Sequence, residues 1–106
     1  MMAIENQDEH DVSIPNTLSM KNYPNPFNPT TTIILSLPKA SNVQLDIYNI
    51  KGQKVKTLLN EVMLPGSHNV TWDGKDNCNK KVASGVYLYK FQTDKKTIIN
   101  KMLLLK

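Results

Sequence analysis

Short runs of alternating apolar and polar residues, each closed by a turn signal, fill the sequence from Leu18 onward. Successive side chains of a strand point to opposite faces, so a period of two is typical of strands with one buried face. The run from Val43 to Tyr48 is the clearest case, with Val43, Leu45 and Ile47 on one face. No stretch places apolar residues at helical spacing between capping residues. The pattern therefore predicts an all-β fold.

Turn signals divide this part of the chain into seven candidate strands. Asn49–Gly52 predicts a tight turn, because its glycine can take a positive φ, and this turn joins the third and fourth strands into a hairpin. The sixth candidate is the longest and most aromatic, with Tyr87, Tyr89 and Phe91 at a period of two. Seven short antiparallel strands at this spacing predict an immunoglobulin-like β-sandwich. The candidates lie at residues 18–23, 30–37, 43–48, 53–60, 68–72, 82–93 and 97–105.

The beginning of the chain differs from the rest. Residues 1–17 are polar and acidic and lack a hydrophobic period, so we expect a flexible tail or linker from the end of an upstream region, with the sandwich at residues 18–106. The first residues lack the basic start and apolar stretch of a secretory signal peptide. The longest apolar runs fall far short of the roughly 20 residues that a membrane-spanning helix needs, so no insertion into a membrane is expected.

The charge of the chain bears on its partners. All 13 basic residues are lysines, against 9 acidic residues, which gives a formal net charge of +4. Nucleic-acid readout relies on the paired hydrogen bonds that arginine forms with phosphates and guanine edges. Because the sequence has no arginine, we expect no nucleic-acid partner. We interpret the lysines as a solubilising coat that also protects edge strands.

The sequence offers little material for catalysis. Its two histidines are His10, in the acidic segment, and His68, within a candidate strand. A triad of Ser67, His68 and Asp73 is disfavoured, because Ser67 and His68 are adjacent in a strand and point to opposite faces. The glycines are dispersed and form no phosphate-binding loop. We therefore expect a protein that is not an enzyme, with no catalytic residues and no cofactor.

A polar loop follows the fifth candidate strand and gathers several oxygen-bearing side chains. Asp73, Asp76, Asn77 and Asn79 are candidate calcium ligands, although their spacing does not match an EF-hand loop. Asp and Asn side chains also bond to nearby backbone groups in ordinary β-turns, and this is the interpretation that we favour. The single cysteine, Cys78, excludes an internal disulfide and has no sequence partner for a redox motif.

Two further segments stand out. Tyr23–Pro29 contains three of the six prolines, each of which fixes its φ at about −65° and biases the residue before it toward extended geometry. This predicts a stiff corner that carries the chain from one sheet to the other, with Tyr23 and Phe27 packed beneath it, and a binding role is the alternative. Met102–Lys106 is apolar on both faces of the last candidate strand. Such a strand is expected to be covered on both sides or to accept a strand from a partner.

Five segments, in their order along the chain, resemble the C-terminal sorting domain (type A) of proteins exported by the type IX, or Por, secretion system of Bacteroidetes and related bacteria. Residues 23–33 resemble its opening motif, 47–53 and 72–76 its middle, 82–87 its Gly-x-Tyr strand, and 101–106 its basic and apolar tail. The middle segments also resemble the Ig-like domain of the flagellar hook-capping protein, which lacks the Tyr-Pro-Asn-Pro opening. The resemblance marks the following residues for sorting: Tyr23, Pro24, Asn25, Pro26, Gly85, Tyr87, Lys101, Met102, Leu103, Leu104, Leu105 and Lys106.

The resemblance implies an Ig-like sandwich attached to a cargo enzyme or adhesin on its N-terminal side. It implies passage through the periplasm and then recognition by the outer-membrane machinery of the type IX system, which delivers the cargo to the cell surface or the medium. Cargo of this kind can be attached to surface lipopolysaccharide, and the domain is often cleaved off. The competing hypothesis is a structural or adhesive Ig-like module that binds a protein or a glycan and has no sorting role.

Overall fold

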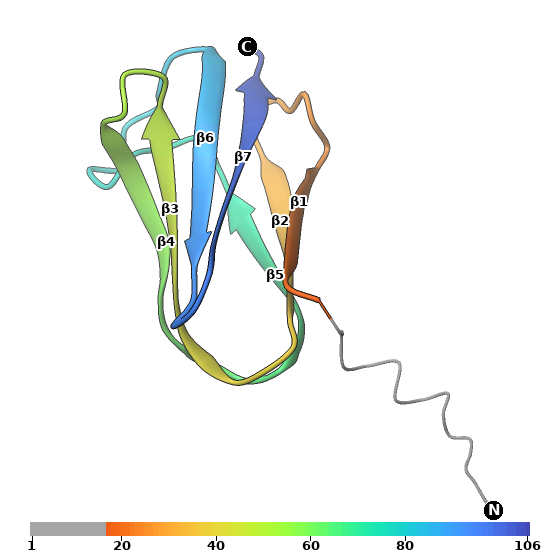
Figure 1. Cartoon of the computed structure of the whole chain (residues 1–106). Coiled ribbons are helices and arrows are strands. Elements are labelled where there is room, and N and C mark those ends of the chain that lie inside the picture. Colours follow the sequence, from red (N-terminus) through yellow and green to blue (C-terminus); the bar gives the residue numbers. More distant parts are fainter. Residues whose placement is uncertain (1–16) are drawn as a thin grey trace, which may run out of the picture.

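The computed structural model describes residues 17–106 and places them in seven strands that form two facing sheets (Figure 1). This described part contains no helix, and so none that is long and apolar enough to cross a membrane. The expected acidic tail lies, apart from Thr17, outside the described residues. The strands are β1 (Ser19–Tyr23), β2 (Thr31–Leu37), β3 (Ser41–Asn49), β4 (Lys54–Met63), β5 (Gly66–Trp72), β6 (Gly85–Gln92) and β7 (Thr97–Leu104).

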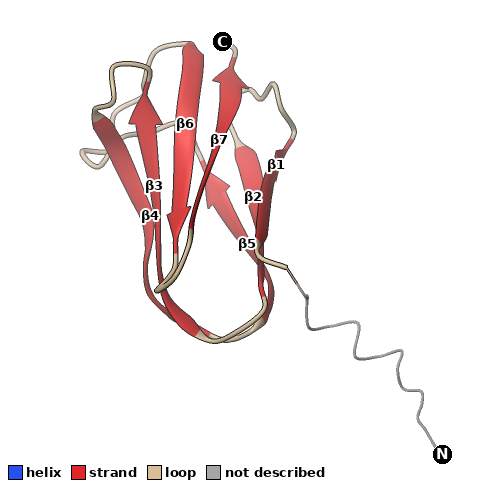
Figure 2. Ribbon diagram, viewed as in Figure 1, coloured by secondary structure: helices blue, strands red, loops and turns tan. Residues whose placement is uncertain are grey.

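Both sheets are antiparallel throughout (Figure 2). Three strands form one sheet in the order β1-β2-β5, and four form the other in the order β4-β3-β6-β7. The predicted all-β, immunoglobulin-like sandwich of seven antiparallel strands is confirmed. The sixth strand begins at Gly85 rather than Val82, because the Val82 N–H donates to the Gly74 carbonyl of the preceding loop (3.0 Å) instead of joining the ladder.

The core lies between the sheets and follows the alternation in the sequence. Trp72, at the end of β5, is fully buried, and its ring lies 5.7 Å from that of Phe27 and 5.4 Å from that of Tyr87, measured between centroids. Its Nε1–H donates to the Lys75 carbonyl (2.9 Å), so the buried indole has the partner that it needs. The buried apolar residues of β2, β3 and β6 are Ile33, Leu35, Leu37, Val43, Leu45, Ile47, Tyr87, Tyr89 and Phe91.

The predicted hairpin joins β3 and β4. The Asn49 side chain organises its turn, since its Oδ1 accepts the backbone N–H groups of Lys51 (2.9 Å) and Gln53 (3.0 Å). Gly52 has a φ of 83°, which is the left-handed conformation expected of a turn glycine. Local side-chain chemistry therefore sets the register at which the hairpin starts.

The outward face of β3 carries a buried carboxylate. Asp46 is only 1% exposed although its neighbours Leu45 and Ile47 point into the core. Its Oδ1 accepts the Thr57 hydroxyl (2.8 Å), and its Oδ2 accepts the Gln44 amide (2.9 Å) and lies 3.6 Å from the Lys54 ammonium. Each oxygen is thus paired, which is the condition for burying a charge in a protein.

The proline-rich corner does not take the predicted course. It joins β1 to β2, which are neighbours in the same sheet, so the expectation of a sheet-to-sheet crossing is wrong. Phe27 is buried as expected, but Tyr23 is 74% exposed. The reason is the register, since Tyr23 is the last residue of β1 and alternation turns it away from the core that Met20 enters.

Candidate functional site

The fold brings the opening segment and the final strand into direct contact. In Figure 1 the C-terminus lies at the same end of the sandwich as the loop between β1 and β2. Phe27 bridges to Leu104 in parallel. Its N–H donates to the Leu103 carbonyl (2.9 Å), and its carbonyl accepts the Leu105 N–H (2.9 Å). Two of the segments that the sequence analysis singled out therefore form one site.

Asn25 extends this contact with its side chain. Its Oδ1 accepts the Leu103 N–H (3.0 Å), and its Nδ2 donates to the Lys101 carbonyl at the longer distance of 3.5 Å. Strand β7 is the edge of the four-stranded sheet, and an edge strand normally presents unpaired N–H and C=O groups to solvent. Asn25 and Phe27 occupy those groups between Lys101 and Leu105. We call this arrangement the edge cap.

The edge cap changes the expectation for partner binding. A strand added to β7 would need the backbone groups that Asn25 and Phe27 already occupy between Lys101 and Leu105. The structure therefore does not support strand addition at this part of the edge. The other expectation, that the strand is covered on both faces, is wrong, because Met102 and Leu104 are buried on one face whereas Ile99 and Leu105 are 57% and 47% exposed on the other.

Polar side chains close the same side of the sandwich below the edge cap. The Asn100 Nδ2 of β7 donates to the Met20 carbonyl of β1 (2.7 Å), and the Tyr89 hydroxyl donates to Asn22 Oδ1 (2.9 Å). The Asn22 Nδ2 in turn donates to the hydroxyl of the buried Thr31 (3.1 Å). Strands β1 and β7 belong to different sheets, and the bond from Asn100 to Met20 connects their edges, while the bond from Tyr89 to Asn22 joins β6 to β1.

The remaining segments of the resemblance gather at the end of the sandwich that holds the edge cap. Gly85 pairs with Leu104 across β6 and β7, and the Tyr87 hydroxyl donates to the Ala83 carbonyl (2.6 Å). Gly74 has a φ of 77°, and a Cβ built on it would lie 3.1 Å from the Pro29 carbonyl oxygen. The backbone after Trp72 therefore packs closely against the proline corner, and the tight contact and the positive φ both favour glycine at that position.

The polar loop uses its side chains on its own backbone and on β4. Asp73 Oδ1 accepts the Lys75 N–H (3.1 Å), and Asp76 Oδ1 accepts the N–H groups of Cys78 (2.9 Å) and Lys80 (3.0 Å). These are the bonds of the turn interpretation. Within residues 17–106 no group of three or more His, Cys, Asp or Glu side chains could hold a metal ion.

The loop also protects the second edge of the four-stranded sheet. The Asn77 N–H donates to the Val55 carbonyl (3.1 Å), and Asn77 Oδ1 accepts the Thr57 N–H (3.2 Å). Asn77 thus pairs with the first part of β4 much as Asn25 pairs with β7. Asn79 has a φ of 64°, a conformation that asparagine tolerates better than most residues.

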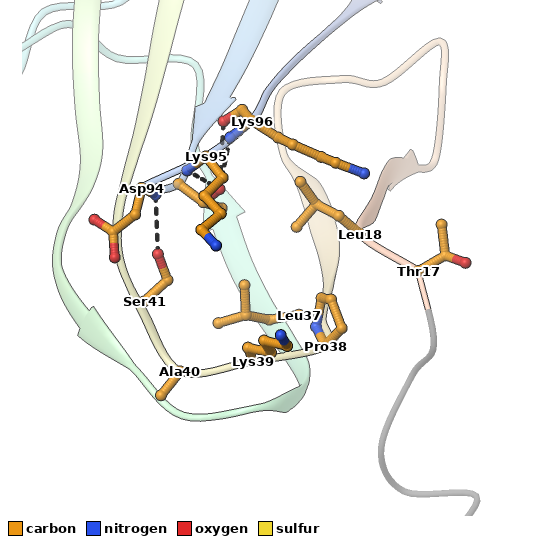
Figure 3. Close-up of a pocket in the computed structure, with 11 residues that line it drawn as sticks. Thr17, Leu18, Leu37, Pro38, Lys39, Ala40, Ser41, Asp94, Lys95 and Lys96 are labelled. Carbon is orange, nitrogen blue, oxygen red and sulfur yellow. Dashed lines mark hydrogen bonds between the residues drawn. The ribbon is translucent and has the colours of Figure 1, made fainter.

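A separate pocket opens at the opposite end of the sandwich, beside the β2–β3 connection (Figure 3). Its volume is about 410 Å³, and it has an apolar floor that includes Leu18 and Leu37. The Lys95 side chain points toward Leu37, and the Lys96 side chain extends past Leu18 (Figure 3). The predicted sorting residues are absent from its lining.

Burial changes the acidity of two core tyrosines. It raises the pKa of Tyr87 above the ordinary value of 10.0, and it does the same for Tyr89, where a hydrogen bond with Asn100 opposes the effect. Folding therefore favours the neutral phenols. Their contribution to stability is complete below pH 10 and is lost as the pH rises from there through the raised pKa values.

We expect the free energy of unfolding to fall with pH above 10, and to fall less steeply in a Tyr87→Phe/Tyr89→Phe variant. Urea titrations at several alkaline pH values measure how steeply the free energy of unfolding falls with pH. This slope does not depend on the stability that the variant loses with the two hydroxyl hydrogen bonds. Tyr23→Phe, at a tyrosine that is 74% exposed, is the control. Equal slopes for the double variant and the wild type would contradict the assignment.

Asn25→Ala is expected to lower the free energy of unfolding by about 1 kcal/mol, because it removes the side-chain bonds to Leu103 and Lys101. Hydrogen exchange at the Leu103 amide is expected to accelerate, and nuclear magnetic resonance measures both effects. Asn28→Ala, at an exposed neighbour in the same corner, is the matched control. Unchanged exchange at Leu103 in the Asn25 variant would contradict the edge cap.

The sequence showed that the tail is apolar on both faces, but not which of the two faces is buried. Met102 and Leu104 are buried, whereas Leu103 is half-buried and Leu105 is 47% exposed. The alternation of the whole strand from Thr97 onward separates the buried residues from the exposed ones, and it is the pattern that could have identified them. The role of Asn25 carried no local signal, because its partners are more than 70 residues away.

The family model of the FlgD Ig-like domain matches residues 27–97 of this chain. The match therefore leaves out Tyr23–Pro26 and most of β7, the two segments that the edge cap joins. No curated protein matches the sequence.

Three solved structures share the fold. Latent PorU from Porphyromonas gingivalis has a TM-score of 0.69 at 20% identity, over 86% of this chain and 9% of that one. PorZ, described as an essential surface component of the type IX secretion system of the same organism, has a TM-score of 0.56 at 21% identity, over 83% of this chain and 12% of that one. FlgD from P. aeruginosa has a TM-score of 0.57 at 33% identity, over 70% and 59%. The chain thus spans about a tenth of PorU and PorZ and 59% of FlgD.

Proposed function

The chain belongs to the family of FlgD Ig-like domains, and from this premise we propose that it is a non-catalytic sorting domain that directs an attached cargo protein across the outer membrane by the type IX secretion system. Its partners in this proposal are the outer-membrane machinery of that system and the cargo on its N-terminal side. Its route is the periplasm and then the cell surface or the medium, where the cargo can become attached to lipopolysaccharide.

The edge cap is the observation that carries the proposal. A domain that serves only as a spacer needs the shared part of the family fold, which the match to residues 27–97 covers. Asn25 lies outside the match on one side and Lys101–Leu105 on the other, and hydrogen bonds hold the two together. These unmatched residues coincide with the opening and closing motifs of the sorting family that the sequence resembles.

The likeness to PorU and PorZ gives further support at the level of the fold. Both come from one organism, and PorZ is described as part of the type IX system. Identities of 20% and 21% carry the fold alone. The sorting role therefore remains the part of the proposal that an export experiment must test.

The test is an export assay. The full chain is fused to the C-terminus of a reporter that has a signal peptide, and the fusion is produced in a bacterium with a type IX system and in a mutant without its translocon. We expect the reporter on the surface or in the medium of the first strain and in the periplasm of the second. Retention in the periplasm of both strains would overturn the proposal.

The Ig-like domain of P. aeruginosa FlgD is the matched control for that assay, since it is 33% identical over 70% of this chain. The same similarity favours the second candidate function, a structural or adhesive module. If the FlgD fusion and the fusion to this chain behave alike, the structural module is the better description. Export of this chain alone supports sorting.

A further inference from the structure

The outward face of β6 and β7 combines exposed apolar side chains with lysines. Tyr87, Tyr89 and Phe91 point into the core, so the residues between them point outward. The register pairs these outward residues across the two strands. We call the resulting surface the β6–β7 patch, and it consists of Val86, Leu88, Lys90, Ile99, Lys101 and Leu103.

The patch contains several neighbouring apolar side chains that are exposed or half-buried. Ile99 is 57% exposed and Val86 is 41% exposed, while Leu88 and Leu103 are half-buried beside them. Single exposed apolar residues are common on protein surfaces, whereas contiguous ones mark sites of interaction. Ile50, which is 73% exposed at the tip of the β3–β4 hairpin, is an example of the isolated kind.

The charge of the patch has one sign. The charged side chains that β6 and β7 place on this face are Lys90 and Lys101. Lys90 Nζ lies 5.0 Å from the ring centroid of Tyr48 on the adjacent strand, which holds the ammonium over the sheet. The nearest carboxylate in the register is Asp46, opposite Lys90, and it is buried and paired within its own network. A complementary surface would carry carboxylates around apolar side chains.

We infer that the export machinery recognises the domain through the β6–β7 patch, by a protein surface of apolar side chains bordered by carboxylates, and not by pairing a strand with β7 between Lys101 and Leu105. This inference rests on the proposed function and adds the surface that performs it. Asn25 and Phe27 occupy the backbone of β7 between Lys101 and Leu105, so what the strand offers a partner there is its outward side chains. Lys101 and Leu103 are those side chains, and Ile99 lies on the same outward face of the strand.

The experiment introduces opposite charge into the patch and measures export of the same reporter fusion. We expect Ile99→Glu/Lys101→Glu to lower the exported fraction about tenfold or more, as loss of a central contact does at other interfaces. Ile50→Glu/Lys51→Glu makes the same two chemical changes at exposed residues of the hairpin tip and is expected to leave export unchanged.

Two checks distinguish loss of recognition from loss of folding as the cause of reduced export. The purified full chain must have the same melting temperature in both double variants. If the Ile99→Glu/Lys101→Glu variant melts at a lower temperature, the milder Ile99→Ser variant replaces it in the export assay. If the wild-type fusion is exported and the patch variants are exported equally well, the patch inference fails while the sorting function stands. If the wild-type fusion remains in the periplasm, the sorting function fails and the inference falls with it.

Discussion

Replacing Trp72 with alanine is expected to lower the free energy of unfolding by about 3–5 kcal/mol, since this is the usual cost of removing a large buried aromatic side chain. Trp72 is fully buried between the rings of Phe27 and Tyr87. The substitution leaves a cavity in the core and also frees the Lys75 carbonyl that the indole N–H now satisfies. A domain of this size has a total stability of about 5–15 kcal/mol, so the variant should be close to its folding limit.

Urea unfolding followed by circular dichroism measures this change. Tyr23→Ala is the control, because Tyr23 is an aromatic residue of the same end of the sandwich that is 74% exposed, and its loss is expected to alter stability by no more than about 0.5 kcal/mol. A Trp72→Ala variant as stable as the Tyr23→Ala variant would refute the packing described for the core.

Deleting Lys101–Lys106 is expected to abolish cooperative unfolding altogether. Met102 and Leu104 are 2% and 0% exposed, and loss of each such side chain costs about 2–5 kcal/mol. The deletion also removes the part of β7 to which Asn25 and Phe27 are bonded. Together these losses reach the whole stability of a typical domain.

The measurement is a thermal melt of the truncated chain by circular dichroism. A shorter deletion of Leu105 and Lys106, which are both exposed, is the control and is expected to keep a cooperative melt. A cooperative melt of the longer deletion at the wild-type temperature would contradict the expectation. Loss of export in the longer deletion would then reflect unfolding, so the Ile99 and Lys101 variants are the sharper test of recognition.

The fold could be predicted because residues that are close in the sequence determine its strands and turns. Alternation in Val43–Ile47 and Tyr87–Phe91 determines which side chains enter the core, and Asn49 and Gly52 form their turn through contacts with near neighbours. Such patterns depend on the residue types themselves. The strand count, the hairpin and the sandwich all follow from them.

The candidate site could be predicted only in part, because its contacts are long-range. The sequence singled out both the proline corner and the tail, but nothing in either segment indicates that Asn25 bonds to Leu103. The corner was expected to cross between sheets because proline restricts the local backbone without determining which strands pair. The sheet order that places β1 beside β2, and β7 at an edge, is a tertiary outcome.

The edge cap also affects when, during synthesis of the chain, the domain can be completed. It joins residues that are 76 and 78 positions apart, and a ribosome produces the first of them long before the last. Pairing between such distant segments is slow, because loop-closure entropy opposes it. Until residues 101–105 are available, the sandwich remains open on the β1–β7 side and the β6–β7 patch is incomplete. A chain that stops before Lys101 therefore presents neither feature, which links the finished surface to synthesis of the whole domain.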